Sequence, residues 1–125
     1  MHVLGKLRDA VVRDGILLDL QVIRPHPQIE SEGRVVYIAD GSPLFKGADA
    51  ARTAVDLFIA DGLLVEDAVD DHDVLKHHDS GADLLAHWPP RRATPATETA
   101  AFLRTITAEC VVRERCRLRK LRRVG

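Results

Sequence analysis

The sequence predicts an α/β fold with a small mixed β-sheet, helices packed on it and a long antiparallel C-terminal strand. Segments with a helical spacing of apolar residues alternate along the chain with short apolar runs that are typical of strands. Near the end, residues 108–123 alternate between two faces, as a long strand does. The length of 125 residues, 46% of them hydrophobic, fits one core. We therefore expect a single α/β domain over residues 1–125.

The first predicted helix leads directly into the first predicted strand. Leu4, Leu7 and Val11 share one helical face. The helix should end at Asp14-Gly15, with Gly15 as its left-handed cap. An apolar strand buried on both faces is expected next, at residues 16–23. Three shorter segments follow: a polar loop to residue 33, a β-branched strand at residues 34–39 and a turn at residues 40–43.

The second half of the chain repeats the order of helix, Asp-Gly pair and strand. A helix at about residues 49–60 should end at Asp61-Gly62, before a strand at residues 63–69 whose continuation to residue 77 stays open. Two such units predict that their strands run parallel. Two further helices are indicated, one capped by Ser80 and one opening at Thr94-Pro95.

The terminal segment carries both cysteines on its more apolar face. We expect a long strand at residues 108–123, with a helix as the alternative. Cys110 and Cys116 are too far apart for an intrachain disulfide in either structure. Reduced thiols on an apolar face indicate core residues and a cytoplasmic protein. The N-terminal residues do not predict a signal peptide, and no apolar run is long enough to cross a membrane.

The formal net charge of -1 conceals two blocks of opposite sign. Residues 61–83 hold eight acidic residues against Lys76 alone. Residues 104–125 hold eight basic residues against two acids, Glu109 and Glu114. We expect the two blocks to lie on neighbouring strands and to pair across the sheet. The alternative is a nucleic-acid surface, formed by Arg113, Arg115, Arg117, Arg119, Arg122 and Arg123.

Histidines and acids are densest at residues 70–79, which makes this segment the candidate metal site. Imidazole and carboxylate are ligands that zinc and similar ions favour. The candidate ligands are His72, His77, His78 and Asp79. On a strand the neighbours His77 and His78 point in opposite directions, and the spacing matches no compact zinc motif. The alternative interpretation is a solvated strand end followed by a helix cap.

The order of elements resembles the C-terminal half of a class I S-adenosylmethionine-dependent methyltransferase. The segment LRDAVVRDGILLD at residues 7–19 is similar to the family's fifth strand and the helix that leads into it, with Arg13-Asp14-Gly15 in place of the usual proline and glycines. The resemblance implies that residues 64–69 form the sixth strand. It also implies that residues 108–119 form the seventh, antiparallel and inserted between the other two. The family's glycine-rich cofactor turn is missing, so we assign no cofactor and no catalytic residue.

These observations favour a non-enzymatic, methyltransferase-like remnant that acts as an oligomeric or partner-binding module. Half of such a fold leaves a strand edge and an apolar face uncovered, and exposed edges must be paired or protected. A homodimer, or docking on a separate protein, is the expected solution. Two alternatives stay open: a nucleic-acid-binding protein, and a small enzyme or ligand-binding protein whose site forms between subunits. The Arg-rich, Asn-free composition is typical of a GC-rich bacterial genome.

Overall fold

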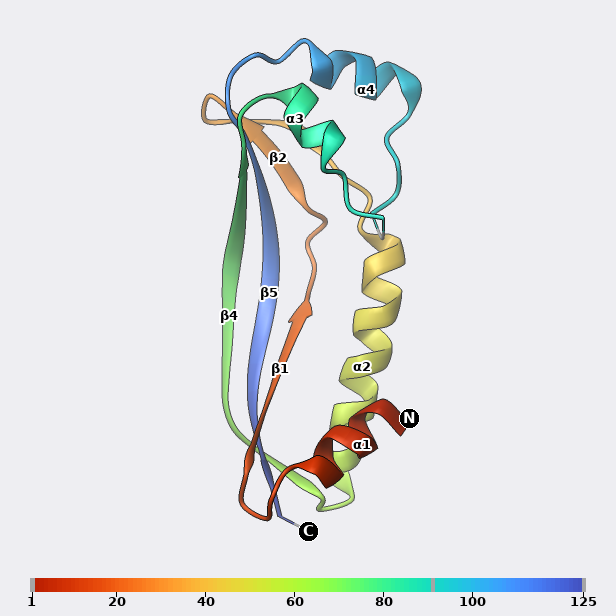
Figure 1. The fold of residues 1–125 in the computed structure, drawn as a ribbon, viewed down its shortest axis with the longest axis vertical. Coiled ribbons are helices and arrows are strands. Elements are labelled where there is room, and N and C mark those ends of the chain that lie inside the picture. Colours follow the sequence, from red (N-terminus) through yellow and green to blue (C-terminus); the bar gives the residue numbers. More distant parts are fainter. Residues whose placement is uncertain (1, 91, 125) are drawn as a thin grey trace. The chain divides into compact units, whose positions relative to one another are not determined.

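The computed structural model describes residues 2–90 and 92–124, and within them it has the α/β fold that the sequence predicts. Helices and strands are distributed along the whole described chain (Figure 1). None of the described helices has the length and hydropathy needed to cross a membrane. The elements in chain order are α1 (His2–Ala10), β1 (Ile16–Val22), β2 (Gln28–Ser31), β3 (Arg34–Ile38), α2 (Ser42–Ala60), β4 (Leu64–His78), α3 (Gly81–Ala86), α4 (Thr97–Arg104) and β5 (Cys110–Arg123).

The long strand β5 organises the sheet. It pairs antiparallel with β1 over residues 116–122 and with β2 over residues 111–113, and it also pairs with β4. The strand β3 pairs antiparallel with β2. Because β1 and β4 are both antiparallel to β5, they run parallel to each other, with β5 between them. This is the predicted order, in which the basic strand lies directly against the acidic one.

The described residues form two compact units, and both long strands contribute to each of them. The first unit contains residues 2–22, 46–72 and 116–124. The second contains residues 23–45 and 73–115, without residue 91. Each unit has its own hydrophobic core.

The core of the first unit lies between its helices and one face of its strands. Leu4 of α1, Val55 of α2, Leu64 of β4 and Leu121 of β5 are buried together, and Leu17 of β1 packs against them. The opposite face of β1 is exposed, so the prediction of a strand buried on both faces is wrong. In the described structure the helices α1 and α2 pack on one face of this strand only.

The core of the second unit joins β2, β5 and α3. Ile29, Leu84, Cys110 and Val112 are fully buried, and Trp88 packs against them. The loop predicted up to residue 33 is wrong in part, because residues 28–31 form the strand β2. Ile29 of this strand supplies a core side chain, and the Ser31 hydroxyl donates a hydrogen bond to the Glu109 carbonyl.

Three helix ends differ from the prediction. The helix α4 begins at Thr97 after the N-cap Ala96, and not at the predicted Thr94-Pro95. Asp14, not Gly15, adopts the left-handed conformation, with φ 66°. Gly15 is needed for another reason: a Cβ atom there would lie 2.3 Å from a Val11 methyl carbon. The helix α2 begins at Ser42, earlier than expected, and the Asp40 carboxylate accepts a hydrogen bond from the Ser42 amide at 2.9 Å, which satisfies one of the free amides of the first turn. The predicted caps at Ser80 and Gly62 are confirmed.

The alternation of β5 changes along the strand. In the second unit the even-numbered residues Cys110, Val112 and Glu114 are buried, as predicted. In the first unit the pattern shifts, so that Arg119 and Leu121 are buried while Leu118 is half-buried. The predicted apolar face therefore ends at Cys116. Each part of β5 buries the side chains that face the core of its own unit. Leu121 belongs to the core of the first unit and Val112 to the core of the second.

Candidate functional site

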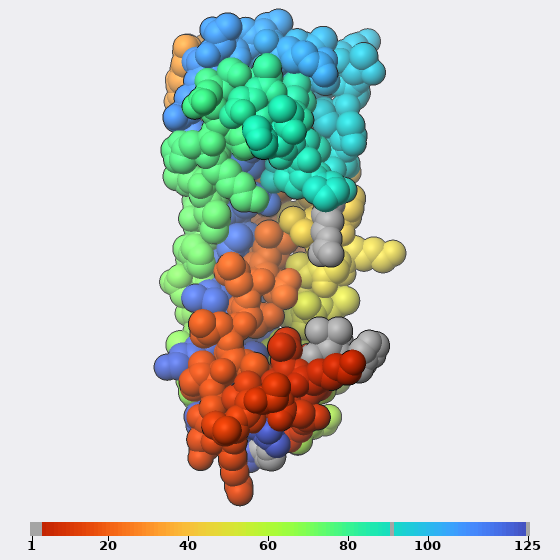
Figure 2. Space-filling view, viewed as in Figure 1, coloured from red at the N-terminus to blue at the C-terminus, as the bar shows by residue number. Residues whose placement is uncertain are grey.

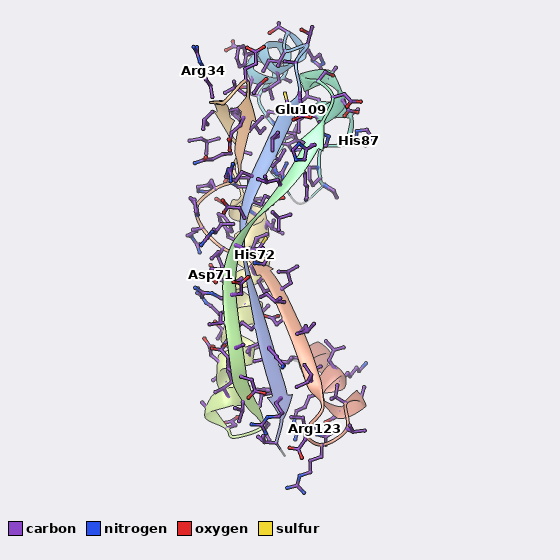
Figure 3. All side chains as sticks on the ribbon, turned by 90° about the vertical axis from the view of Figure 1, so that its left-hand side faces the viewer. Arg34, Asp71, His72, His87, Glu109 and Arg123 are labelled. Carbon is purple, nitrogen blue, oxygen red and sulfur yellow. The ribbon has the colours of Figure 1, made fainter. Side chains whose placement is uncertain are left out.

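The arginines of β5 make ion pairs in both units. In the first unit Arg117 binds Asp71 of β4, with Nε 2.8 Å from Oδ1. Arg119 pairs with Glu66 of β4 and, at 3.0 Å, with Asp56 of α2. Arg122 Nε lies 3.2 Å from Asp67 of β4. Figure 3 shows Asp71 on β4 and Arg123 at the end of β5.

The second unit continues this pattern. Arg113 Nε lies 2.7 Å from Glu30 Oε2 of β2, and Arg113 Nη1 lies 2.9 Å from Asp73 of β4. Arg115 reaches the other oxygen of Asp73 at 3.1 Å. The prediction that the two charge blocks pair across neighbouring strands is therefore confirmed. The arginines in these contacts therefore face carboxylates of the same chain.

The pKa values follow from these contacts. Hydrogen bonds from Arg113 and then Arg115 lower the pKa of the Asp73 carboxyl. The hydrogen bond to Asp71 raises the pKa of Arg117. Burial acts to lower the pKa of Arg119, but its hydrogen bonds to Glu66 and Asp56 outweigh burial, so that pKa is raised. The charged forms of all these groups are favoured in the folded protein.

Arg123 differs from the other arginines in its described contacts. Its Nη1 donates to the backbone carbonyls of Arg8 and Val11, at 3.2 Å and 2.6 Å. These carbonyls lie in the last turn of α1 and just after it, where backbone acceptors lack part of the hydrogen bonding of a helix interior. Arg123 therefore caps that helix.

The buried acid of β5 is also neutralised. Glu114 Oε1 forms ion pairs with Lys76 Nζ at 2.9 Å and with Arg92 Nη2 at 3.2 Å. Arg92 is buried and its guanidinium lies 5.1 Å from the centre of the Trp88 ring. A buried carboxylate is costly unless it is paired, and these two cations meet that need.

The strand β1 carries the most apolar exposed surface of the first unit's sheet. Leu18, Leu20 and Ile16 are 69%, 56% and 43% exposed, and they alternate along one face of the strand. We call these three residues the β1 apolar row. Among the described residues, β5 is the only strand paired with β1, so β1 is an edge strand. Figure 2 shows α1 and β1 (red to orange) at the surface in this view.

A cleft of about 390 Å³ opens in the first unit between α2 and the sheet. Most of the charged groups that line it pair with one another, as Arg119 does with Asp56 and Glu66, while Arg52 pairs with Asp49. The cleft therefore contains balanced charge rather than an unpaired acid, base or nucleophile aimed at a ligand. Its lining residues are Arg52, Asp56, Glu66, Val69, Asp71, Arg117 and Arg119.

The structure separates the four predicted metal ligands. His72 lies in the first unit, with Nδ1 2.9 Å from Asp70 Oδ2 (Figure 3). In the second unit His77 contacts Glu109 at 3.2 Å, whereas His78 faces α3 and the Asp83 carboxylate at 3.5 Å. The Asp79 amide donates a hydrogen bond to Asp83 at 3.0 Å. Only His78 joins a described group of three potential ligands.

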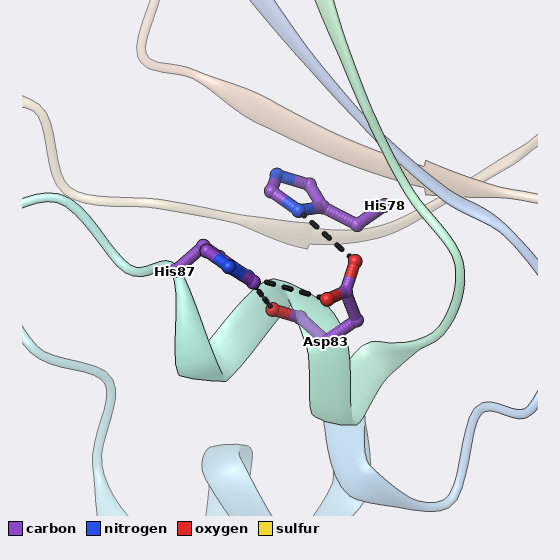
Figure 4. A group of neighbouring side chains, drawn as sticks. All are labelled: His78, Asp83 and His87. Carbon is purple, nitrogen blue, oxygen red and sulfur yellow. Dashed lines mark hydrogen bonds and ion pairs between the residues drawn. The ribbon is translucent and has the colours of Figure 1, made fainter.

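That group is completed by two residues that the sequence reasoning missed. His78, Asp83 and His87 each offer one ligand atom, and the three atoms lie within 4.8 Å of one another (Figure 4). The signal was present in the sequence, because residues four apart on a helix share one face. Neither Asp83 nor His87 is among the predicted ligands.

Both cysteines are buried. Burial raises the pKa of the Cys110 thiol, which disfavours the reactive thiolate. The prediction that the cysteines are core residues is confirmed by their burial.

Comparisons of the chain with protein-family models, with curated proteins and with solved structures found no match.

Proposed function

We propose that this chain is a non-enzymatic module that acts by self-association, with β1 as its assembly strand. The observation that carries the proposal is the β1 apolar row on an edge strand. The order β1–β5–β4 supports describing the chain as a methyltransferase-like remnant, since it is the order that the sequence resemblance implies. The proposal itself depends on β1 and not on that resemblance.

An edge strand of this composition favours association. Natural edge strands are usually protected by lysine, proline or a bulge. The strand β1 has no lysine or proline, and its one charged residue, Asp19, is half-buried and accepts a hydrogen bond from Gln21 at 3.0 Å. Removing a leucine or isoleucine side chain from water contributes about 1.5–3 kcal/mol. Pairing of the free strand edge would add main-chain hydrogen bonds.

The sequence of β1 is self-complementary, which favours a second copy as the partner. In an antiparallel pair centred on Leu18, that residue faces its own copy and Ile16 faces Leu20, so the two apolar rows are continuous. The same register places Leu17 opposite Asp19. Centring the pair on Asp19 instead would place two carboxylates opposite each other, which is unfavourable. A two-fold symmetric contact of this kind closes on itself as a dimer.

The mass of the protein in solution tests this proposal. Sedimentation equilibrium of the 13.8 kDa chain should give twice that mass. Leu18→Arg should give the monomer mass, because it places a charge in the centre of the paired row. Val12→Arg is the matched control: Val12 is 77% exposed but precedes the strand, so this variant should remain a dimer.

Two results would contradict self-association through β1. One is a wild-type monomer at about 100 μM, a concentration at which contacts of micromolar affinity are formed. The other is a Leu18→Arg chain that stays dimeric. Circular dichroism of both variants shows whether the substituted chains are folded.

No described contact favours the nucleic-acid alternative. Arg113, Arg115, Arg117, Arg119 and Arg122 face carboxylates, and Arg123 donates to backbone carbonyls. A nucleic-acid surface needs cations that can neutralise phosphates. These arginines would first have to leave their present partners.

A further inference from the structure

We propose that His78, Asp83 and His87 form a binding site for a divalent transition-metal ion, with zinc as the best match. The three residues belong to the second unit, at the end of β4 and on α3. The inference is independent of the self-association proposed above, which depends on β1 in the first unit.

The geometry brings three donors to one point. His78 Nδ1 lies 3.5 Å from Asp83 Oδ2, and His87 Nδ1 lies 3.2 Å from Asp83 Oδ1 (Figure 4). The two imidazole rings are stacked, with centroids 6.0 Å apart. Ligands bound to tetrahedral zinc at 2.0–2.2 Å lie about 3.3 Å from one another. Each histidine nitrogen is already about this far from the carboxylate, and the three donor atoms lie within 4.8 Å of one another, so small side-chain rotations would let them bind one ion.

The local structure holds the carboxylate in place. Ser80 caps α3 by accepting a hydrogen bond from the Asp83 amide at 3.1 Å. The Asp79 amide donates to Asp83 Oδ2 at 3.0 Å. Hydrogen bonds to a ligating carboxylate are the usual support of a metal site. They orient Asp83 between the two histidines.

A hydrogen bond also holds His87 beside the carboxylate. Its Nδ1 lies 2.9 Å from the Asp83 backbone carbonyl, which can only accept a hydrogen bond. Without an ion the ring proton is therefore on Nδ1 when this bond is made. An ion bound through Nδ1, which lies 3.2 Å from Asp83 Oδ1, would replace that proton. His78 is half-buried and His87 is exposed, so an ion can enter from the side of His87.

The donor set selects the class of ion. Two imidazoles and one carboxylate suit zinc and neighbouring transition metals, whereas calcium and magnesium prefer oxygen ligands alone. Three protein ligands leave one position of a tetrahedral ion open to water or another donor. The site would also tie the end of β4 to α3, so that zinc should stabilise the second unit.

Zinc titration of the untagged protein against a fluorescent chelator tests the site. We expect one zinc per chain and no comparable binding of magnesium. His78→Gln and His87→Gln should each weaken zinc binding by at least about 10-fold, because each removes a ligand. Thermal denaturation should show a rise in Tm with zinc in the wild-type protein and a smaller rise in both variants.

His77→Gln is the matched control. His77 precedes His78 in β4 but contacts Glu109 at 3.2 Å, away from the group of three. Its substitution should change the zinc affinity by less than about 2-fold, as expected for a residue outside the site. The proposal is overturned if the wild-type chain takes up no zinc at micromolar concentration. It is equally overturned if His78→Gln and His87→Gln bind zinc as the wild type does.

Discussion

Arg117 and Asp71 form a bidentate ion pair, in which Arg117 Nε lies 2.8 Å from Asp71 Oδ1 and Arg117 Nη2 lies 3.0 Å from Asp71 Oδ2. The pair joins the basic strand β5 to the acidic strand β4 inside the first unit. Paired guanidinium and carboxylate groups of this geometry are stronger than single contacts. The opposite charges that cancel in the overall composition are thus placed against each other in the sheet.

Replacing Arg117 with lysine should destabilise the protein, since an ammonium cannot make the two parallel hydrogen bonds to Asp71. Both side chains are about one-third exposed, so solvent screening limits the loss to about 1 kcal/mol. Urea denaturation measures the free energy of unfolding. Arg52→Lys is the control, because Arg52 makes one 3.7 Å contact to Asp49. Equal losses in the two variants would contradict the structural importance of the Arg117 pair.

Asp73 should make stability depend on pH in the acid range. Its pKa is lowered from the ordinary value of 3.8 by hydrogen bonds from Arg113 and Arg115. The ionised Asp73 carboxylate therefore stabilises the folded protein fully above about pH 5, and this contribution is lost as the pH falls through the lowered pKa. The stability advantage of wild type over Asp73→Asn should shrink on acidification from about pH 6 to about pH 2. An advantage that grows on acidification would contradict this assignment.

Gly81→Ala should strongly destabilise the second unit. A Cβ atom at this position would lie 1.7 Å from the Leu103 carbonyl oxygen, so α3 and α4 would have to separate. We expect a loss of more than about 2 kcal/mol in urea denaturation. Gly47→Ala is the control: Gly47 is inside α2 with open space around it, and alanine should stabilise the helix by about 0.5–1 kcal/mol. Similar effects of the two substitutions would contradict the close packing at Gly81.

Neither cysteine should react readily while the protein is folded. Cys110 and Cys116 are buried, and burial raises the pKa of Cys110. Ellman's reagent should label both thiols in denaturant and react far more slowly without it. A native thiol that reacts at the rate of the unfolded chain would show that one of the two is accessible.

Much of the fold can be predicted because local signals agree with the final structure. The alternation of apolar and polar residues indicates the long strand β5, and the Asp61-Gly62 pair marks the end of α2. The opposite charges of residues 61–83 and 104–125 also indicate that β4 and β5 are neighbours. These signals act between neighbouring residues or between whole strands, so they do not depend on side-chain detail.

The remaining features depend on tertiary contacts that local patterns do not encode. β2 is polar except for Ile29, and it is a strand because it pairs with β3 and β5. The exposure of Leu18 could not be foreseen, because an apolar strand is usually covered on both faces in α/β proteins. The group around Asp83 forms because β4 ends beside α3, which brings His78 to a helix that follows it in the chain.

Cysteine cross-linking at the centre of the proposed strand pair tests self-association through β1 most directly. In the register centred on Leu18 the two copies of that residue lie about 4.5–5.5 Å apart between Cα atoms, within the range of a disulfide. Under mild oxidation Leu18→Cys should therefore form a covalent dimer, whereas Val12→Cys should remain largely monomeric on a denaturing gel. Equal cross-linking of the two variants, or no cross-linking of Leu18→Cys, would contradict assembly through this strand.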